Sequence, residues 1–398
     1  MSKRLLILGA GRGQVPLIKK AKSMGITTIV ATHSSKYPGV PIADEICYVD
    51  ISHPEEVYEK AKHLAVDGIA TCCLDTGMSA LGYICDRLNL TGLHEITAKM
   101  SNDKLLMKEA LTKHNVNTAE FVKIDSEESL IEALKHFKFP VILKAVDLQG
   151  SRGIYVVNTE EAARIALEKI FAETKKDFCI LENFIVGYEF GAEAFVYNNE
   201  ILFVLPHGKN VYISNTAVPI GHYAPFDENE DIHIKTKKVV TEAINALGLN
   251  NCAVNVDLII KDNEVYVIEL TGRVGANCLS EIVSIYYGID YYEMIIKMAL
   301  HENPKEIFNN QKTKKIPVAA KMLISENQSG ILKEIVNSNN NDDENICDIT
   351  FFVKHGDEIR KFTNSNDCLA QVIVKGTALE ECFKFIDKVI ENIKFICE

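Results

Sequence analysis

The N-terminal segment RLLILGAGRGQVP most constrains the fold, because a short apolar run ends in alternating glycines before a helical pattern begins. Residues 4–8 predict a buried strand, and residues 14–24 predict an amphipathic helix that ends before Gly25. The same alternation then recurs, with strands predicted at 26–32, 46–49 and 68–73 and a helix at 54–65. Alternating strands and helices are typical of a parallel, doubly wound α/β sheet.

The glycine turn raises the question of a bound dinucleotide. A dinucleotide fingerprint has glycine at its first, third and sixth positions and an acidic residue about 20 residues further on. Gly9 and Gly11 fit, but Gln14 occupies the sixth position, and the second strand ends in ATHSS, without an acid. Three readings stay open: a structural turn, a site for an anionic substrate group at Gly11 and Arg12, and a dinucleotide site.

Composition excludes several classes of partner. The 398 residues carry a net charge of −12, which disfavours binding to nucleic acid or to an anionic membrane surface. No segment approaches the roughly 20 apolar residues of a membrane span, and the first apolar run is shorter than a signal-peptide core. The 11 cysteines include no C-x-x-C pair, so we expect a cytoplasmic protein with reduced thiols, and we interpret Cys72 and Cys73, at the end of a predicted strand, as core residues.

Two further blocks follow the doubly wound block of residues 1–95. Residues 96–310 combine longer strands with helices, predicted at 126–137, 159–172, 232–247 and 277–300. Within this block, AVNVDLIIKDNEVYVIEL predicts a hairpin that turns at Asp262 and Asn263. Residues 311–398 contain a polar loop at 337–345 and an amphipathic helix at 377–395, which together predict a small α+β cap.

Two lysines in the middle block suit a polyphosphate. Lys104 lies near the start of a helix that Ser101 or Asn102 can cap, and Lys144 ends an apolar strand. The loop after Lys144 contains Gly150, Ser151, Arg152 and Gly153, whose backbone amides and side chains can approach phosphate oxygens closely. The loop lacks the G-K-[ST] sequence of a P-loop, and the alternative reading is a polar loop beside a solvated lysine.

Acidic residues on later strands extend the predicted site. Glu182 and Glu189 flank Gly187, where an apolar segment with fixed carboxylates can hold an adenine and a ribose. Asp257 and Glu269 lie on the two strands of the hairpin and can face each other, which suits Mg²⁺, although a solvated outer face is the alternative. Arg273 leaves the second strand beside them and can stabilise charge on a phosphoryl group.

Together these stretches resemble the ATP-grasp superfamily, specifically its carboxylate–amine ligase branch, over the whole chain. The resemblance implies a Rossmann-like domain over 1–95, an ATP-grasp catalytic domain over 96–310 and an α+β cap over 311–398. It assigns catalysis to Arg273 and Lys144 and magnesium to Asp257, Glu269 and Thr271. It assigns ATP binding to Lys104, Lys144, Gly150, Ser151, Arg152, Gly153, Glu182, the main chain of Asn183, Phe184 and Ile185, and Glu189.

The chain departs from the family pattern at the metal motif E-x-N-x-R. Here the motif reads Glu269, Leu270, Thr271, Gly272, Arg273, so the asparagine is absent and Thr271 or water takes its place. Asn255 stands where several relatives have histidine, and we assign it no chemical role. The segment VPIGHYAPF resembles a substrate-side motif of this branch, so we expect His222, together with Gly11, Arg12 and Arg273, to contact a substrate.

The implied activity uses ATP and Mg²⁺ to join a small-molecule carboxylate, expected to be an amino acid, to an amine through an acyl-phosphate, with release of ADP and phosphate. A homodimer is expected by family analogy alone. The nearest alternative is an ATP-grasp enzyme of purine-pathway type that activates bicarbonate or formate. An ATP-binding protein without turnover and a dinucleotide oxidoreductase are the alternatives from other classes.

Overall fold

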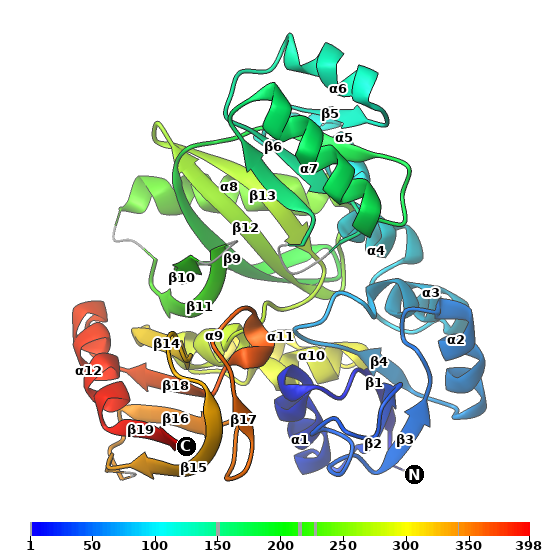
Figure 1. The fold of residues 1–398 in the computed structure, drawn as a ribbon. Coiled ribbons are helices and arrows are strands. Elements are labelled where there is room, and N and C mark those ends of the chain that lie inside the picture. Colours follow the sequence, from blue (N-terminus) through cyan, green and yellow to red (C-terminus); the bar gives the residue numbers. More distant parts are fainter. Residues whose placement is uncertain (1, 149–151, 214–216, 227–228, 341) are drawn as a thin grey trace. The chain divides into compact units, whose positions relative to one another are not determined.

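The computed structural model describes residues 2–148, 152–213, 217–226, 229–340 and 342–398. The chain forms two compact units (Figure 1). The first comprises Met1–Val204, Asn229–Val274 and Tyr292–Lys305, and the second comprises Leu205–Glu228, Gly275–Tyr291 and Glu306–Glu398. The three-block division expected from the sequence stays a prediction. None of the described helices has the length and apolar character needed to cross a lipid bilayer.

The first unit begins with the predicted parallel α/β sheet, drawn in blue in Figure 1. Its strands pair in the order β3-β2-β1-β4, and all three pairings are parallel. Leu5–Leu8 of β1 are completely buried, as expected for a central strand that is covered on both faces. The elements are β1 (Arg4–Leu8), η1 (Arg12–Gln14), α1 (Val15–Ser23), β2 (Thr27–Thr32), β3 (Glu45–Tyr48), α2 (Pro54–His63), β4 (Gly68–Ala70) and α3 (Met78–Leu88).

The largest difference from the predicted strand boundaries of this sheet is at the end of the fourth strand. The fourth strand ends at Ala70, not at residue 73, and Cys73 has a left-handed backbone with φ 58°. Cys72 and Cys73 therefore lie in the loop after β4. Cys72 is completely buried, and its thiol donates a hydrogen bond to the carbonyl oxygen of Gly13 at 3.1 Å. The loop after β4 thus packs against the glycine turn after β1.

An antiparallel sheet in the order β5-β8-β6-β7 follows in the first unit. Helices α6 and α7 pack against it, and their apolar residues form one core with Leu143 and Leu181 of the strands. The elements of this part are α4 (Glu95–Asn102), α5 (Lys104–Lys113), β5 (Phe121–Ile124), α6 (Glu127–Leu134), β6 (Val141–Ala145), β7 (Ile154–Val157), α7 (Glu160–Glu173) and β8 (Cys179–Asn183).

The predicted hairpin is present and forms the edge of another antiparallel sheet. Strands β13, β12 and β9 are neighbours in that order, with β10 next to β9, and α8 packs against β13. Asp262 and Asn263 form the two-residue turn with φ of 52° and 61°, which matches the right-handed twist of a hairpin. The elements are β9 (Tyr188–Tyr197), β10 (Glu200–Ile213), α8 (Glu230–Leu247), β12 (Cys252–Lys261) and β13 (Glu264–Thr271).

The second unit contains the later residues of β10 and the C-terminal part of the chain. Strands β11, β14, β18 and β16 pair antiparallel in that order, and α12 covers β14 and β18. The unit also contains α9, η2 and the strands β15, β17 and β19. Residues 311–398, expected to form an α+β cap, combine strands with the helix α12. The elements are β11 (Ala217–Ala224), α9 (Leu279–Tyr287), β14 (Val318–Leu323), β15 (Gly330–Asn337), β16 (Ile346–Phe351), β17 (Glu358–Ile359), η2 (Ser365–Asp367), β18 (Ala370–Lys375), α12 (Leu379–Glu391) and β19 (Ile393–Cys397).

Two predicted helices differ from the structure by more than their terminal residues. The helix predicted over 277–300 is divided into α9 and α10 (Tyr291–Ala299), because Gly288 has a left-handed φ of 68° and ends α9. The short helix α11 (Lys305–Asn309) follows α10 in the chain. The helix predicted over 377–395 ends at Glu391, and the last residues form β19 instead, with the alternating burial of a strand.

Candidate active site

Lys144 and Glu182 lie side by side on adjacent strands of the β5-β8-β6-β7 sheet. Lys144 Nζ is 3.0 Å from Glu182 Oε2, and Lys108 Nζ of α5 is 3.2 Å from the same oxygen. Lys108 also donates to Thr118 Oγ1 at 2.7 Å, and that hydroxyl donates to the carbonyl oxygen of Val267 at 2.8 Å. One buried carboxylate is therefore held between two lysines, and the chain of hydrogen bonds fixes α5 against β13.

The electrostatics of this cluster keep Glu182 ionised. Burial alone would raise the pKa of Glu182, but the charges of Lys144 and Lys108 and their hydrogen bonds lower it below its usual value. Burial lowers the pKa of Lys108 to about 8, and Glu182 opposes part of that shift. The second carboxylate oxygen, Glu182 Oε1, is buried and accepts no hydrogen bond from any residue that the structure describes. A ligand that donates a hydrogen bond would satisfy it.

Lys104 is the first residue of α5 and points toward the hairpin. Its Nζ is 3.3 Å from Glu269 Oε1 and donates to the carbonyl oxygen of Leu148 at 3.0 Å. The helix is not capped by Ser101 or Asn102, which end α4, but by Asp103, whose side chain accepts hydrogen bonds from the amides of Leu105 and Leu106. The lysine thus joins the start of the glycine loop to the hairpin carboxylate.

The hairpin places its polar residues in two rows on one face. Asp257 is directly opposite Glu269, as predicted, and Asn255 is directly opposite Thr271. On the other side of β12, Asn255 is paired with Glu193 of β9, and its Nδ2 donates to Glu193 Oε1 at 2.8 Å. Because side chains alternate along a strand, both rows face the same side of the sheet.

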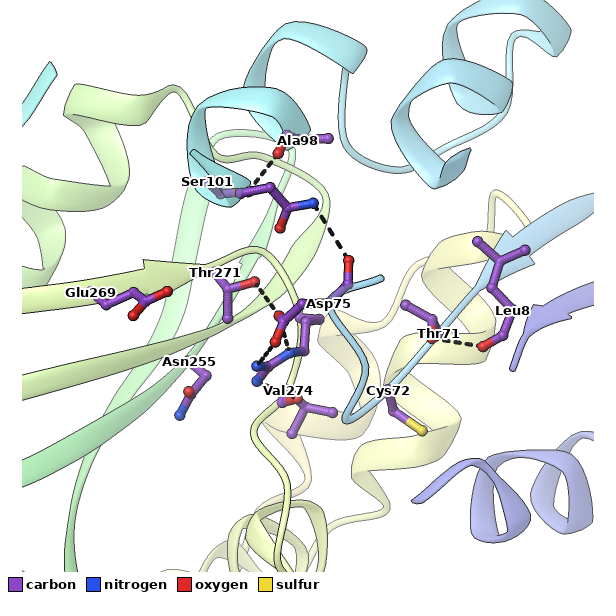
Figure 2. Close-up of polar contacts among 12 residues, drawn as sticks. Leu8, Thr71, Cys72, Asp75, Ala98, Ser101, Asn255, Glu269, Thr271 and Val274 are labelled. Atoms are coloured by element: carbon purple, nitrogen blue, oxygen red, sulfur yellow. Dashed lines mark hydrogen bonds and ion pairs between the residues drawn. The ribbon is translucent and has the colours of Figure 1, made fainter. Parts of the chain in front are cut away.

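Arg273 follows β13 and forms a two-pronged ion pair with Asp75, in the loop between β4 and α3. Its Nε and Nη2 atoms are each 2.7 Å from an oxygen of Asp75, and Nη1 donates to the carbonyl oxygen of Val274. Thr271 Oγ1 donates to the same carboxylate at 3.1 Å (Figure 2). Burial would raise the pKa of Asp75, but the charge and hydrogen bonds of Arg273 lower it below its usual value. The pair is therefore ionised at neutral pH.

The glycine turn that raised the dinucleotide question is closed by Gln14. The amide of Gly11 donates to Gln14 Oε1 at 2.9 Å, and Gln14 Nε2 donates to the carbonyl oxygen of Cys72 at 2.6 Å. The side chain at the position of the missing third glycine thus occupies an amide that a phosphate would use. Arg12 is the first residue of η1, next to Gly11.

The remaining predicted nucleotide residues fall on connecting segments. Gly150 and Ser151 lie outside the described residues. Gly153 has a left-handed φ of 63°, and its carbonyl oxygen accepts the amide of Ala145 at 2.8 Å, so Arg152 and Gly153 follow the loop directly into β7.

The bend after β8 holds the predicted adenine segment. The amides of Asn183 and Phe184 donate to the carbonyl oxygens of Glu120 and Pro140, at 3.0 and 3.4 Å. Ile185 follows these two engaged amides, and Glu189 is exposed on β9.

His222 belongs to the second unit. It lies on β11, is buried, and packs edge-on against His207 of β10 with ring centroids 5.1 Å apart. Burial lowers the pKa of His207 to about 3, so that ring is neutral.

Sequence reasoning missed two residues of the site. Asp75 is separated from Arg273 by 198 positions. A polar residue just after a buried parallel strand was the available signal, because ligands gather at the carboxyl ends of such strands. Lys108 lies four residues after Lys104, and that spacing places both lysines on one face of the helix.

Comparisons with known proteins identify the family of this chain. The model of the phosphoribosylglycinamide synthetase ATP-grasp (A) domain matches residues 102–278, and that of the L-amino acid ligase C-terminal domain 2 matches residues 322–398. The crystal structure of phosphoribosylglycinamide synthetase from Anaerococcus prevotii is 54% identical, with a TM-score of 0.89 and full coverage of both chains. That of L-amino acid ligase from Bacillus licheniformis has a TM-score of 0.85 at 19% identity, over 100% of this chain and 99% of that one.

Curated proteins are similar to this chain at lower identity. A formate-dependent phosphoribosylglycinamide formyltransferase of Prochlorococcus marinus is 24% identical over 75% of this chain and 76% of its own length. An alanine–anticapsin ligase of Bacillus subtilis is 25% identical over 61% of this chain and 56% of its own length. The chain belongs to the ATP-grasp superfamily of ligases. It is an ATP-dependent enzyme that forms carbon–nitrogen bonds, as the family resemblance of its sequence implied.

Proposed function

We propose that the enzyme joins the carboxylate of an amino acid to an amine through an acyl-phosphate, with Mg²⁺ as its metal. The observation that carries the proposal is the 3.3 Å pairing of Lys104 Nζ with Glu269 Oε1, because it sets a phosphate-binding cation beside a metal-binding carboxylate. Lys144, 3.0 Å from Glu182, supplies a second cation. Positioning and electrostatic stabilisation account for most of the catalysis in phosphoryl transfer, so these charges suit the task.

The donor set fits Mg²⁺ as a partner of ATP. Mg²⁺ in nucleotide sites takes one or two carboxylates, and substrate phosphates and water complete its octahedral shell. Asp257 and Glu269 are opposite each other, which provides two such carboxylates. The described residues contain no group of three or more His, Cys, Asp or Glu side chains placed to hold a metal alone, so a phosphate-dependent site is the one that fits. When bound, the ion supplies positive charge to the phosphate oxygens.

The adenine fits the bend after β8. Glu182 Oε1 is buried without a donor among the described residues, and the exocyclic amino group of adenine donates two hydrogen bonds. We expect the amide of Ile185 to reach the adenine ring, because those of Asn183 and Phe184 are already engaged. Glu189 and the loop residues Gly150, Ser151, Arg152 and Gly153 keep their proposed contacts with the ribose and phosphates.

The reaction proceeds in two displacements. A carboxylate oxygen of the first substrate attacks the γ-phosphorus of ATP, and the bond to the leaving ADP oxygen breaks. The amine then attacks the acyl carbon, the carbon–oxygen bond to phosphate breaks, and the nitrogen loses a proton. Lys104 and Lys144 neutralise the phosphates in the first step, and Arg273 stabilises the acyl-phosphate before the second. We place His222, Gly11 and Arg12 on the substrate side.

The C-terminal match favours an amino acid as the acid, because residues 322–398 match the L-amino acid ligase domain. The name of the 54% identical protein contains phosphoribosylglycinamide, which is likewise an amide of an amino acid. The second candidate is activation of formate or bicarbonate, which the similarity to a formate-dependent formyltransferase supports.

The test is release of ADP and phosphate by the purified enzyme with ATP and Mg²⁺. Amino acids are supplied singly and in pairs, glycine is paired with a phosphorylated ribosylamine, and formate and bicarbonate are separate additions. We expect release that requires an amino acid together with an amine. Release with formate or bicarbonate alone would move the assignment to the second candidate.

A further inference from the structure

We propose that Asp75 is a positioning residue of the metal–nucleotide site: it fixes Thr271 as an acceptor oxygen and Arg273 as an oriented guanidinium. This inference rests on the proposed function. Asp75 comes from the loop after β4, which the proposed reaction does not otherwise use. Its carboxylate contacts Thr271, the last residue of the hairpin, and Arg273, two residues further on. Figure 2 shows the hydroxyl of Thr271 directed toward the carboxylate of Asp75.

The hydroxyl of Thr271 carries a single hydrogen, which it donates to the carboxylate of Asp75. Thr271 Oγ1 donates to Asp75 Oδ1 at 3.1 Å. A carboxylate that is ionised only accepts hydrogen bonds, so the direction of this bond is fixed. The lone pairs of Thr271 Oγ1 are then left to accept. A hydroxyl that would otherwise rotate between donor and acceptor roles therefore behaves like an amide carbonyl, which only accepts.

This oxygen lies on the correct face for a metal. Thr271 follows Glu269 by two residues on β13, and side chains two apart share one face of a strand. Asp257, opposite Glu269, belongs to the same face. The exchange of asparagine for threonine in the E-x-N-x-R motif thus preserves a neutral oxygen ligand, provided that Asp75 holds the hydroxyl hydrogen.

The same carboxylate orients Arg273. A guanidinium has five N–H donors in a rigid plane. Two of them bind Asp75 and a third binds the carbonyl oxygen of Val274, so two remain for an oxyanion within the part of the chain that the structure describes. A two-pronged pair fixes both the position and the tilt of that plane. Asp75 thereby sets where the two remaining donors point.

The test measures binding of Mn²⁺ to the enzyme–ADP complex by electron paramagnetic resonance, with full-length Thr271→Val, Thr271→Ser, Asp75→Asn and Asp75→Asn/Thr271→Val variants. We expect Thr271→Val and Asp75→Asn each to weaken Mn²⁺ binding by about 10- to 100-fold, the range for partners of metal ligands. Thr271→Ser keeps the hydroxyl and should retain the wild-type affinity. The double variant should bind Mn²⁺ no more weakly than the single variant with the lower affinity, because both changes remove the same acceptor oxygen.

Asp50→Asn is the matched control, because Asp50 also lies in a loop of the N-terminal block, and among the described residues its carboxylate accepts hydrogen bonds from Ser52 of its own turn. Thr271→Val leaves no buried charge unpaired, so it keeps the test valid if Asp75→Asn fails to fold. The proposal would be overturned if Thr271→Val bound Mn²⁺ within twofold of the wild-type affinity. It would also be overturned if the affinity losses of the two single variants multiplied in the double variant. A wild-type enzyme that binds no ADP would instead refute the proposed function, and this inference with it.

Discussion

Lys108 Nζ lies 3.2 Å from Glu182 Oε2, and the two side chains are only 2% and 3% exposed. Lys144 reaches the same oxygen, so the buried cluster carries one negative and two positive charges. We expect its net charge of +1 to attract the phosphates of a nucleotide. Breaking such a pair leaves a buried charge without compensation, which is more costly than loss of a surface ion pair.

The titration of Lys108 gives a stability prediction. Its pKa is lowered from 10.5 to about 8 in the folded protein, so between pH 8 and 10.5 the unfolded chain binds more protons. Stability therefore rises with pH across this window, and the unfavourable contribution is complete below pH 8. We expect the urea midpoint of the wild type to rise relative to that of Lys108→Met from pH 8 to pH 10. Parallel curves for the two proteins would contradict the assignment.

Nucleotide binding should respond in the opposite direction. Deprotonation of Lys108 lowers the charge of the cluster from +1 to zero, so we expect the affinity for ATP to be constant below pH 8 and to fall above it. Isothermal titration calorimetry between pH 7 and 10 measures this dependence. Lys108→Met removes the titrating group, and its affinity should lack the fall. A wild-type affinity that does not change up to pH 10 would contradict this prediction.

Glu182→Gln should reduce the preference for ATP over GTP. The two lysines retain an acceptor if the new amide turns its oxygen toward them, and its NH₂ then faces the base. That group repels the amino group of adenine but donates to the carbonyl oxygen of guanine. We expect the ratio of ATP to GTP affinity to fall at least about tenfold, since a hydrogen bond to a charged group contributes roughly 1.5–3 kcal/mol. The exposed Glu128→Gln is the control, and an unchanged ratio in Glu182→Gln would argue against the adenine position.

Arg273→Met should separate turnover from nucleotide binding. Loss of a preorganised donor to a developing negative charge typically reduces kcat about 10²- to 10³-fold. The affinity for ADP should stay within a few-fold of wild type, because Lys104 and Lys144 remain. The control is Arg87→Met, whose guanidinium pairs with Glu95 on the surface. Loss of ADP binding in parallel with kcat would place Arg273 in nucleotide binding instead.

Gln14→Ala tests the glycine turn. The change leaves the amide of Gly11 and the carbonyl oxygen of Cys72 without their partner, which costs about 1–3 kcal/mol for a buried group. We expect a lower melting temperature with every substrate KM within twofold of wild type. Arg12→Met should instead raise the KM of one substrate at unchanged melting temperature. If Gln14→Ala alone changes a KM, the turn itself binds that substrate.

Local patterns in the sequence predict much of this fold. The turn at Asp262 and Asn263 sets the register of the hairpin as far as the pair Leu258 and Val267, and an unbroken register would next pair Asp257 with Ile268. A register shift between Asp257 and Leu258 places Asp257 opposite Glu269 instead, and the local pattern does not predict that shift. The apolar pattern over 277–300 hides the break at Gly288, because both helices bury apolar residues. The segment after Glu391 satisfies a helical pattern and a strand pattern alike, and tertiary pairing of β19 with β15 decides between them.

The site is predictable only in part, for a related reason. Lys104, Lys144 and the hairpin carboxylates each occupy a recognisable local motif. The contact between Asp75 and Arg273 joins loops 198 residues apart, and local sequence patterns do not predict contacts over such a separation. Lys108 is a lysine on a helix, which normally indicates solvent, and only the fold reveals that it is buried against Glu182.

The two-residue turn of the hairpin has a further consequence for how such an enzyme can vary. Val254, Val256 and Leu258 of β12 are completely buried on one face, while Asn255 and Asp257 alternate with them on the other. The register that starts at this turn shifts by one residue between Asp257 and Leu258, and this irregularity places Glu269, and not Ile268, opposite Asp257. A change of one residue in the length of the turn would therefore need a compensating change at this irregularity to keep Asp257 opposite Glu269, and we expect the two positions to vary together in viable length variants.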